Sequence, residues 1–167
     1  MNPGSMKITT RSDREIVMTR VFNAPRHLVF EALTQPELVQ RWLVGPPGWS
    51  MVTCQIDLNV GGTFRFVWRN HDGSEIGMHG LYQEISPPDR LVNTETFDFG
   101  CEAQSGEQLA TTILTERERK TTLTCSIIYP SKEARDAIFG TDMERGVTAS
   151  YNRLEELLAS TLSQVGT

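Results

Sequence analysis

The sequence has no run of basic residues, no closely spaced cysteines and no long apolar stretch. Its 16 Lys and Arg residues are outnumbered by 21 Asp and Glu residues, giving a net charge of -5, whereas binding to phosphate groups requires clustered positive charge. Nucleic acid and anionic membrane surfaces are therefore not expected as partners. The 3 cysteines, Cys54, Cys101 and Cys125, cannot all pair. Without an apolar segment that could act as a signal or membrane span, the sequence predicts a cytoplasmic protein.

Sequence motifs for common chemistry are also missing. There is no phosphate-binding loop, no dinucleotide fingerprint and no nucleophile motif of the form G-x-S-x-G. His27, His71 and His79 lack the spacing of metal ligands, so neither a metal nor a cofactor is expected. His79 is expected on the outer face of a strand, although an inward ring could act as a general base. No catalytic residue is assigned, and the sequence argues more against an enzyme than for one.

The length of 167 residues suits a single domain. The opening MNPGS, followed by a second methionine at Met6, has the form of an expression remnant. Residues 1–6 are therefore assigned to such a remnant, residues 7–162 to one domain and residues 163–167 to a tail.

Local patterns predict an ordered series of strands and helices. A strand is expected from Arg14 to Phe22, because the segment EIVMTRVF mixes β-branched and apolar residues. Two short helices follow, over residues 25–33 and 36–42. Helical periodicity then returns from Ser131 to about Leu162, with a break at Gly140 and Thr141. Between these helical regions six further strands are expected, over residues 50–58, 63–69, 74–85, 90–97, 108–116 and 120–129.

Short, turn-rich separators predict that consecutive strands pair as antiparallel hairpins. The fold class is therefore α+β: a seven-stranded, curved antiparallel sheet wrapped around a long C-terminal helix, with two short helices after the first strand. Sheet and helix must bury one face of each against the other.

The hairpin around the turn NHDG carries an aromatic face. Phe64, Phe66 and Trp68 alternate with Arg65, Val67 and Arg69. A four-residue loop would place Trp68 opposite Ile76 and Phe66 opposite Met78. Two interpretations stay open. These side chains either form a packed core, or line a gap that a bent sheet leaves above the helix. Glycines at positions 61, 62 and 80 fit such bends.

Further inward positions complete a candidate ligand-binding site. A carboxyl at an inward Glu95 would have its pKa raised by burial, whereas an outward Glu95 would be solvated, and the sequence does not decide between them. The full set expected to line the site is Trp42, Phe64, Phe66, Trp68, Ile76, Met78, Tyr82, Glu95, Phe97, Thr112, Met143, Val147 and Tyr151.

Four motifs in combination resemble a known family. They are RW-x-x-GP-x-G (residues 41–48), GG-x-x-R-F (residues 61–66), G-x-Y-x-E-I-x-P-P-x-R-L (residues 80–91) and G-x-x-x-S-x-x-R-L (residues 146–154). From about Arg14 to Ala159 the chain resembles the family named after the activator of heat-shock protein 90 ATPase, in the START-like or SRPBCC superfamily.

This resemblance implies a helix-grip fold with an internal cavity for an apolar small molecule, such as a lipid, a polyketide or an aromatic metabolite. It also implies alternatives: a cyclase or hydratase that uses the same cavity, or a chaperone-interacting module with a role in stress response. The eukaryotic co-chaperone that gives the family its name uses an additional N-terminal domain, which this chain is too short to contain, so chaperone contact is the less favoured partner. A homodimer is compatible with the sequence, which carries no signal for it.

Overall fold

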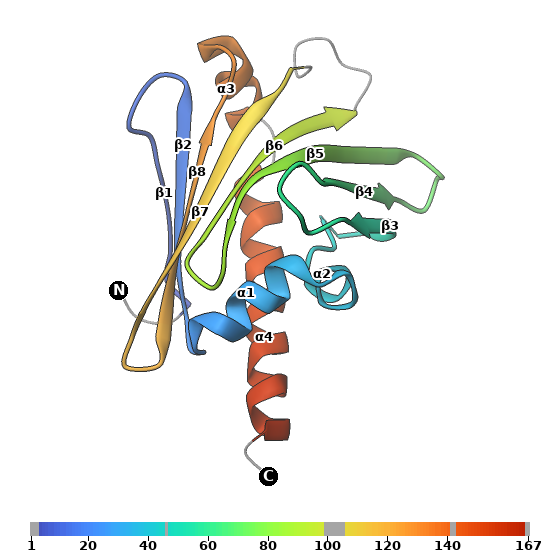
Figure 1. Ribbon diagram of the computed structural model, residues 1–167. Helices are drawn as coiled ribbons and strands as arrows, with labels where there is room; N and C mark the ends of the chain where they lie inside the picture. The colour runs from blue at the N-terminus through green and yellow to red at the C-terminus, as the bar shows by residue number, and fades with distance from the viewer. Residues whose placement is uncertain (1–3, 46, 99–105, 141–142, 166–167) are drawn as a thin grey trace.

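In the computed structural model an eight-stranded antiparallel sheet curves along one long helix (Figure 1). The structure describes residues 4–45, 47–98, 106–140 and 143–165. The order of strands in the sheet is β1-β2-β8-β7-β6-β5-β4-β3. The strands are β1 (Met6–Thr9), β2 (Glu15–Phe22), β3 (Ser50–Ile56), β4 (Thr63–Arg69), β5 (Glu75–Ser86), β6 (Arg90–Asp98), β7 (Gln108–Arg117) and β8 (Lys120–Ile128).

Four helices complete the described part of the chain: α1 (Arg26–Thr34), α2 (Pro36–Trp42), α3 (Lys132–Phe139) and α4 (Met143–Val165). Pro36 lies in the first turn of α2, where its missing N–H has no helical partner in any case. The predicted break in the C-terminal helical region is confirmed, because α3 ends at Phe139 and α4 begins at Met143. In Figure 1, α1 and α2 lie beside α4, on the side that faces the sheet.

The predicted fold class is confirmed, but the count of seven strands was one too low. The additional strand, β1, pairs Met6 with Arg20 and Thr9 with Val17 of β2. Its four residues, MKIT, are too few to show an alternating pattern. The strand forms because β2 offers an open edge to which it can hydrogen bond.

The register of the β4–β5 hairpin agrees with the prediction. Phe66 is opposite Met78 and Trp68 is opposite Ile76. Gly80 allows the sheet to bend after this hairpin, because a Cβ atom there would lie 1.9 Å from the Thr94 carbonyl oxygen and 2.6 Å from the Phe64 ring. Any side chain at this position would push the neighbouring strands apart.

The space between sheet and helices contains two hydrophobic clusters. The larger joins the inner faces of β2 and β4–β8 to α1, α2 and the part of α4 from Tyr151 onward, and it includes Phe22, Val29 and Leu154. The smaller joins β2, β7 and β8 to α3 through residues such as Ile16 and Tyr129. Cys125 and Val147 pack against both clusters and are themselves only half-buried. Burial is therefore incomplete where the two clusters meet.

Candidate functional site

The inner face of the sheet divides into two halves that differ in burial. In the half covered by α1, α2 and the C-terminal part of α4, called here the packed half, Leu91, Leu114, Leu123 and Leu154 are buried. In the other half, several inward-facing side chains keep solvent-accessible surface, although Met78, Ala110 and Ile127 beside them are buried. This accessible half consists of Ile76, Glu95, Phe97, Thr112, Cys125, Met143 and Val147.

The inward direction of these side chains follows from strand pairing. Phe97 is opposite Met78, and Asn93 is opposite Tyr82, and both Met78 and Tyr82 belong to the larger cluster. Glu95 lies between Asn93 and Phe97 on the same strand, so its side chain shares their face. Thr112 and Cys125 are opposite each other on β7 and β8. The question that the sequence left open for Glu95 is thus answered: it faces inward.

Apart from the half-buried Phe97, the aromatic residues predicted to line the site are buried. Ring centroids of Phe64 and Phe66 are 5.1 Å apart, and those of Phe64 and Tyr82 are 5.5 Å apart. Tyr151 on α4 contacts Phe22 edge-on and Trp42 at a tilt. The first two contacts lie within the β4–β5 hairpin, and the contacts of Tyr151 join α4 to β2 and α2.

The two buried indole groups fasten the short helical region to the rest of the domain. Trp42 Nε1 donates a hydrogen bond to the Ala32 carbonyl oxygen at 2.7 Å. Trp68 Nε1 donates to the Leu43 carbonyl oxygen at 2.9 Å. Both side chains are therefore structural as well as close to the predicted site, and their polar atoms are already used.

Glu95 is the acidic group of the accessible half. Gln108 Nε2, on the neighbouring strand, donates a hydrogen bond to Glu95 Oε1 at 2.9 Å. Burial raises the pKa of the Glu95 carboxyl, and hydrogen bonds from Gln108 and Asn93 offset this only in part. Although Glu95 keeps some accessible surface, protein atoms surround it closely enough for desolvation to dominate.

Glu95 acts electrostatically on three further titratable groups, Cys125, Tyr129 and Tyr151. Burial raises the pKa of the Cys125 thiol to about 12. Burial also raises the pKa of the Tyr129 and Tyr151 hydroxyls, with Glu95 and Cys125 contributing in the same direction. All three groups are therefore uncharged at neutral pH. Glu95 is the carboxyl of this set, and its pKa is raised from the ordinary value by burial.

His79 projects from the opposite face of the sheet. Its side chain is 51% exposed, and Nδ1 lies 3.1 Å from Asp98 Oδ2. The expectation of an outward, solvated histidine is therefore met.

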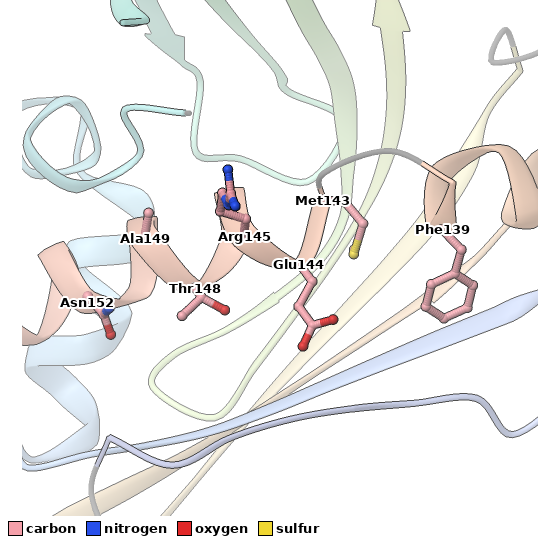
Figure 2. Close-up of a pocket in the computed structure, with 7 residues that line it drawn as sticks. All are labelled: Phe139, Met143, Glu144, Arg145, Thr148, Ala149 and Asn152. Carbon is pink, nitrogen blue, oxygen red and sulfur yellow. The ribbon is translucent and has the colours of Figure 1, made fainter. Parts of the chain in front are cut away.

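Two open hollows are present on the described surface. The first has a volume of about 560 Å³ and is lined by Phe139 of α3 and residues 143–152 of α4. Figure 2 shows Glu144, Thr148 and Asn152 projecting to one side of α4, with Arg145 and Ala149 on another. The second hollow, about 600 Å³, lies over β3–β6 and is lined by His79, Arg65 and Asp98 among others. Of the predicted site residues, Met143 lines the first hollow and Phe64 the second.

A buried arginine lies beside the first hollow. Arg20 on β2 is 2% exposed, and its Nη1 donates to Asn152 Oδ1 at 2.9 Å. Among the buried side-chain atoms that the structure describes, Arg20 Nε and Glu155 Oε2 have no hydrogen-bond partner. Glu155 acts on Arg20 electrostatically, so its charge offsets that of the guanidinium.

Sequence reasoning missed Gln108, Tyr129 and Arg20. Gln108 could have been found only from the register of β6 against β7, which their long connection does not define. Tyr129 and Arg20 each continue an alternating series of apolar residues on the inner face of a strand. The alternation in the sequence could therefore have identified both as inward-facing. Cys101 lies outside the described residues.

No helix in the described part of the chain is both long and apolar enough to cross a membrane. Over the same residues, no group of three or more His, Cys, Asp and Glu side chains is placed to hold a metal ion.

Comparison with known proteins agrees with this architecture. The sequence pattern of the family described as "Activator of Hsp90 ATPase homolog 1-like protein" matches residues 23–159. A crystal structure of a Rhodobacter sphaeroides protein is 32% identical, with a TM-score of 0.86, over 93% of this chain and 99% of that one. A Nitrosomonas europaea protein is 24% identical, with a TM-score of 0.79, over 92% and 99% of the two chains.

A Mycobacterium smegmatis protein shares the fold at 19% identity, with a TM-score of 0.80, over 92% of this chain and 97% of that one. No functionally curated protein matches the sequence. The family match begins just after β2 and ends within α4, so it includes most of the sheet, both short helices and the accessible half. The chain therefore belongs to the Activator of Hsp90 ATPase homolog 1-like family.

Proposed function

We propose that this protein binds an apolar small molecule between the sheet and the N-terminal part of α4, at the accessible half. The observation that carries the proposal is the accessible surface on inward-facing Ile76, Phe97 and Val147. An apolar side chain that faces a domain interior and still touches solvent leaves hydrophobic free energy unrealised. A ligand that covered these side chains would recover it, at about 25 cal/mol per Å² of apolar area.

The composition of the accessible half supports this function. Small-molecule sites are mostly apolar and contain a few polar groups that orient the ligand, and Glu95 and Thr112 would be those groups here. Family membership points the same way, because the family often binds hydrophobic ligands. The proposed ligand is a lipid, a polyketide or an aromatic metabolite, and the proposed setting is the cytoplasm.

The titratable groups favour a binding protein over a cyclase or hydratase. Acid–base catalysis at neutral pH needs groups whose pKa lies near the working pH. Burial raises the pKa of the Cys125 thiol to about 12 and also raises the pKa of the two nearby tyrosines. Glu95 is thus left as a polar anchor without a second titrating partner in this set. A chaperone-interacting module has no comparable support among the described residues.

Titration with the neutral fluorescent probe N-phenyl-1-naphthylamine tests the proposal. We expect a saturable rise in fluorescence with one probe bound per chain. Val147→Phe, which fills the accessible half, should weaken binding at least tenfold. The matched control is Ile113→Phe, because Ile113 is 38% exposed on the outer face of β7; this variant should bind as the wild type does.

Cooperative urea unfolding of each variant shows that the domain stays folded, which excludes probe binding to a loosened core. Unchanged binding by Val147→Phe, or no saturable binding by the wild type, would contradict the proposal. Native mass spectrometry of protein isolated without a tag from its own host would then identify any molecule that copurifies.

A further inference from the structure

The accessible half contains the Glu95 carboxyl, and no cationic side chain among the described residues is an influence on its pKa. The influences on the Glu95 carboxyl are burial and hydrogen bonds from the uncharged side chains of Gln108 and Asn93. From the accessible half itself, Thr112 and Cys125 are also uncharged neighbours on the same face. A polar but uncharged environment of this kind favours the protonated form of an acid.

From this arrangement we infer that the ligand carries a neutral hydrogen-bond acceptor, such as a ketone or ester carbonyl, and that protonated Glu95 donates a hydrogen bond to it. The inference rests on the proposed function and specifies the ligand class for the same site.

The geometry of the Glu95–Gln108 pair assigns a role to each carboxyl oxygen. Oε1 accepts the hydrogen bond from Gln108 Nε2 at 2.9 Å. In a protonated carboxyl the carbonyl oxygen is the better acceptor, so Oε1 takes that role and the proton resides on Oε2. Gln108 is itself buried at 6% exposure, and it therefore fixes the orientation of the acid. The O–H group is then available as a donor.

The remaining charged and titratable groups around the site fit a neutral ligand. Tyr151 lies on α4 and Tyr129 directly follows β8; both hydroxyls stay protonated because burial raises their pKa. On β2, Arg20 acts on Tyr151, but it is bonded to Asn152 and its charge is offset by Glu155. A ligand carboxylate next to Glu95 would therefore be buried without a compensating charge, which is costly.

A hydrocarbon without an acceptor would also bind less well than a carbonyl compound. It would leave the buried Glu95 hydroxyl without a partner, and an unpaired buried donor is penalised. The site should therefore rank ligands of equal chain length with the ketone first, the hydrocarbon second and the carboxylate last.

Displacement of N-phenyl-1-naphthylamine by four ten-carbon compounds tests this ranking: 2-decanone, 1-decene, decanoate and decylammonium. At pH 7 we expect 2-decanone to bind several-fold more tightly than 1-decene and at least tenfold more tightly than decanoate. Glu95→Ala should abolish the preference for 2-decanone over 1-decene. Glu95→Gln should retain it, because the amide keeps an N–H donor.

The pH dependence of the ligand preference distinguishes hydrogen-bond donation by Glu95 from apolar packing alone. In the wild type the preference for 2-decanone should fall as rising pH ionises Glu95, whereas in Glu95→Gln it should stay constant over the same range. Glu75→Gln is the control, because Glu75 is an exposed residue that pairs with Arg69 on the outer face; it should behave as the wild type does.

The outcomes distinguish this inference from the proposed function. If the fluorescent probe binds but 2-decanone and 1-decene compete equally in the wild type, the neutral-acceptor inference is wrong and the apolar site stands. If decylammonium binds most tightly and Glu95→Gln removes that preference, Glu95 is ionised and the inference is overturned. If neither the probe nor any ten-carbon compound binds, both the proposed function and this inference are wrong.

Discussion

The packed half and the accessible half of the inner face lie on the same strands yet differ in burial. Leu91 and Phe97 both face inward from β6, but Leu91 is buried while Phe97 is half-buried. Leu123 and Cys125 show the same contrast on β8. The difference follows from cover: α1 contacts β7 and β8, and α2 contacts α4, at the packed end. Burial is thus most complete under the helices, and less complete around Phe97 and Cys125, where we propose that the ligand binds.

Leu154→Ala should produce the largest effect, because Leu154 is 0% exposed in the larger cluster. The lost apolar contacts and the resulting cavity should lower the free energy of unfolding by about 2–5 kcal/mol. Val147→Ala, in the accessible half of the same helix, should cost only about 1 kcal/mol, because its two methyl groups are half-exposed already. Urea denaturation of both variants measures the contrast. Equal losses would show that the two halves are packed alike.

Adding one methylene group to a helical valine should sharpen the comparison at a smaller scale. Val29→Leu enlarges a side chain that is 0% exposed, so overpacking should destabilise the domain by about 1–3 kcal/mol. Val147→Leu adds the same group in the accessible half and should change stability by less than about 0.5 kcal/mol. Urea denaturation measures both changes in the free energy of unfolding. A larger loss of stability in Val147→Leu than in Val29→Leu would reverse the assignment of the packed half and the accessible half.

Glu95→Gln should have the smallest effect on stability, and its size should depend on pH. Burial raises the folded-state pKa of Glu95 above the ordinary value of a glutamate, so the folded protein binds the proton more tightly than the unfolded chain does. The stabilisation from Glu95 is fully present below that unfolded value and is lost as pH rises through the folded pKa. Relative to the wild type, Glu95→Gln should therefore gain stability with rising pH. Parallel pH profiles of the two proteins would contradict a raised pKa.

The features that sequence predicted well are those set by short-range signals. The NHDG turn fixes the register of the aromatic hairpin, and Phe66 and Trp68 are opposite their predicted partners. Pro36 likewise divides the helical segment after β2: α1 ends at Thr34, and α2 begins at Pro36 itself. In both cases a few adjacent residues determine the geometry.

The features that sequence did not settle depend on pairing between distant segments. Glu95 and Gln108 are 13 residues apart, and the connection between their strands is too long to determine the register. The β7–β8 turn has positive φ angles at Glu118 and Arg119, where glycine or asparagine would have signalled the turn type. The position of α1 and α2 over one end of the sheet also depends on tertiary packing, so the boundary between the packed half and the accessible half could not be predicted.

The short strand β1 has a consequence for the behaviour of the protein in concentrated solution. Edge strands expose unpaired N–H and C=O groups to which another chain can add. Without β1, the edge would be β2, an eight-residue strand containing Ile16, Val17 and Met18, and such an apolar edge favours aggregation. By pairing with β2 from Met6 to Thr9, β1 replaces that edge with a shorter one that includes a lysine, and so protects the sheet against strand addition between molecules.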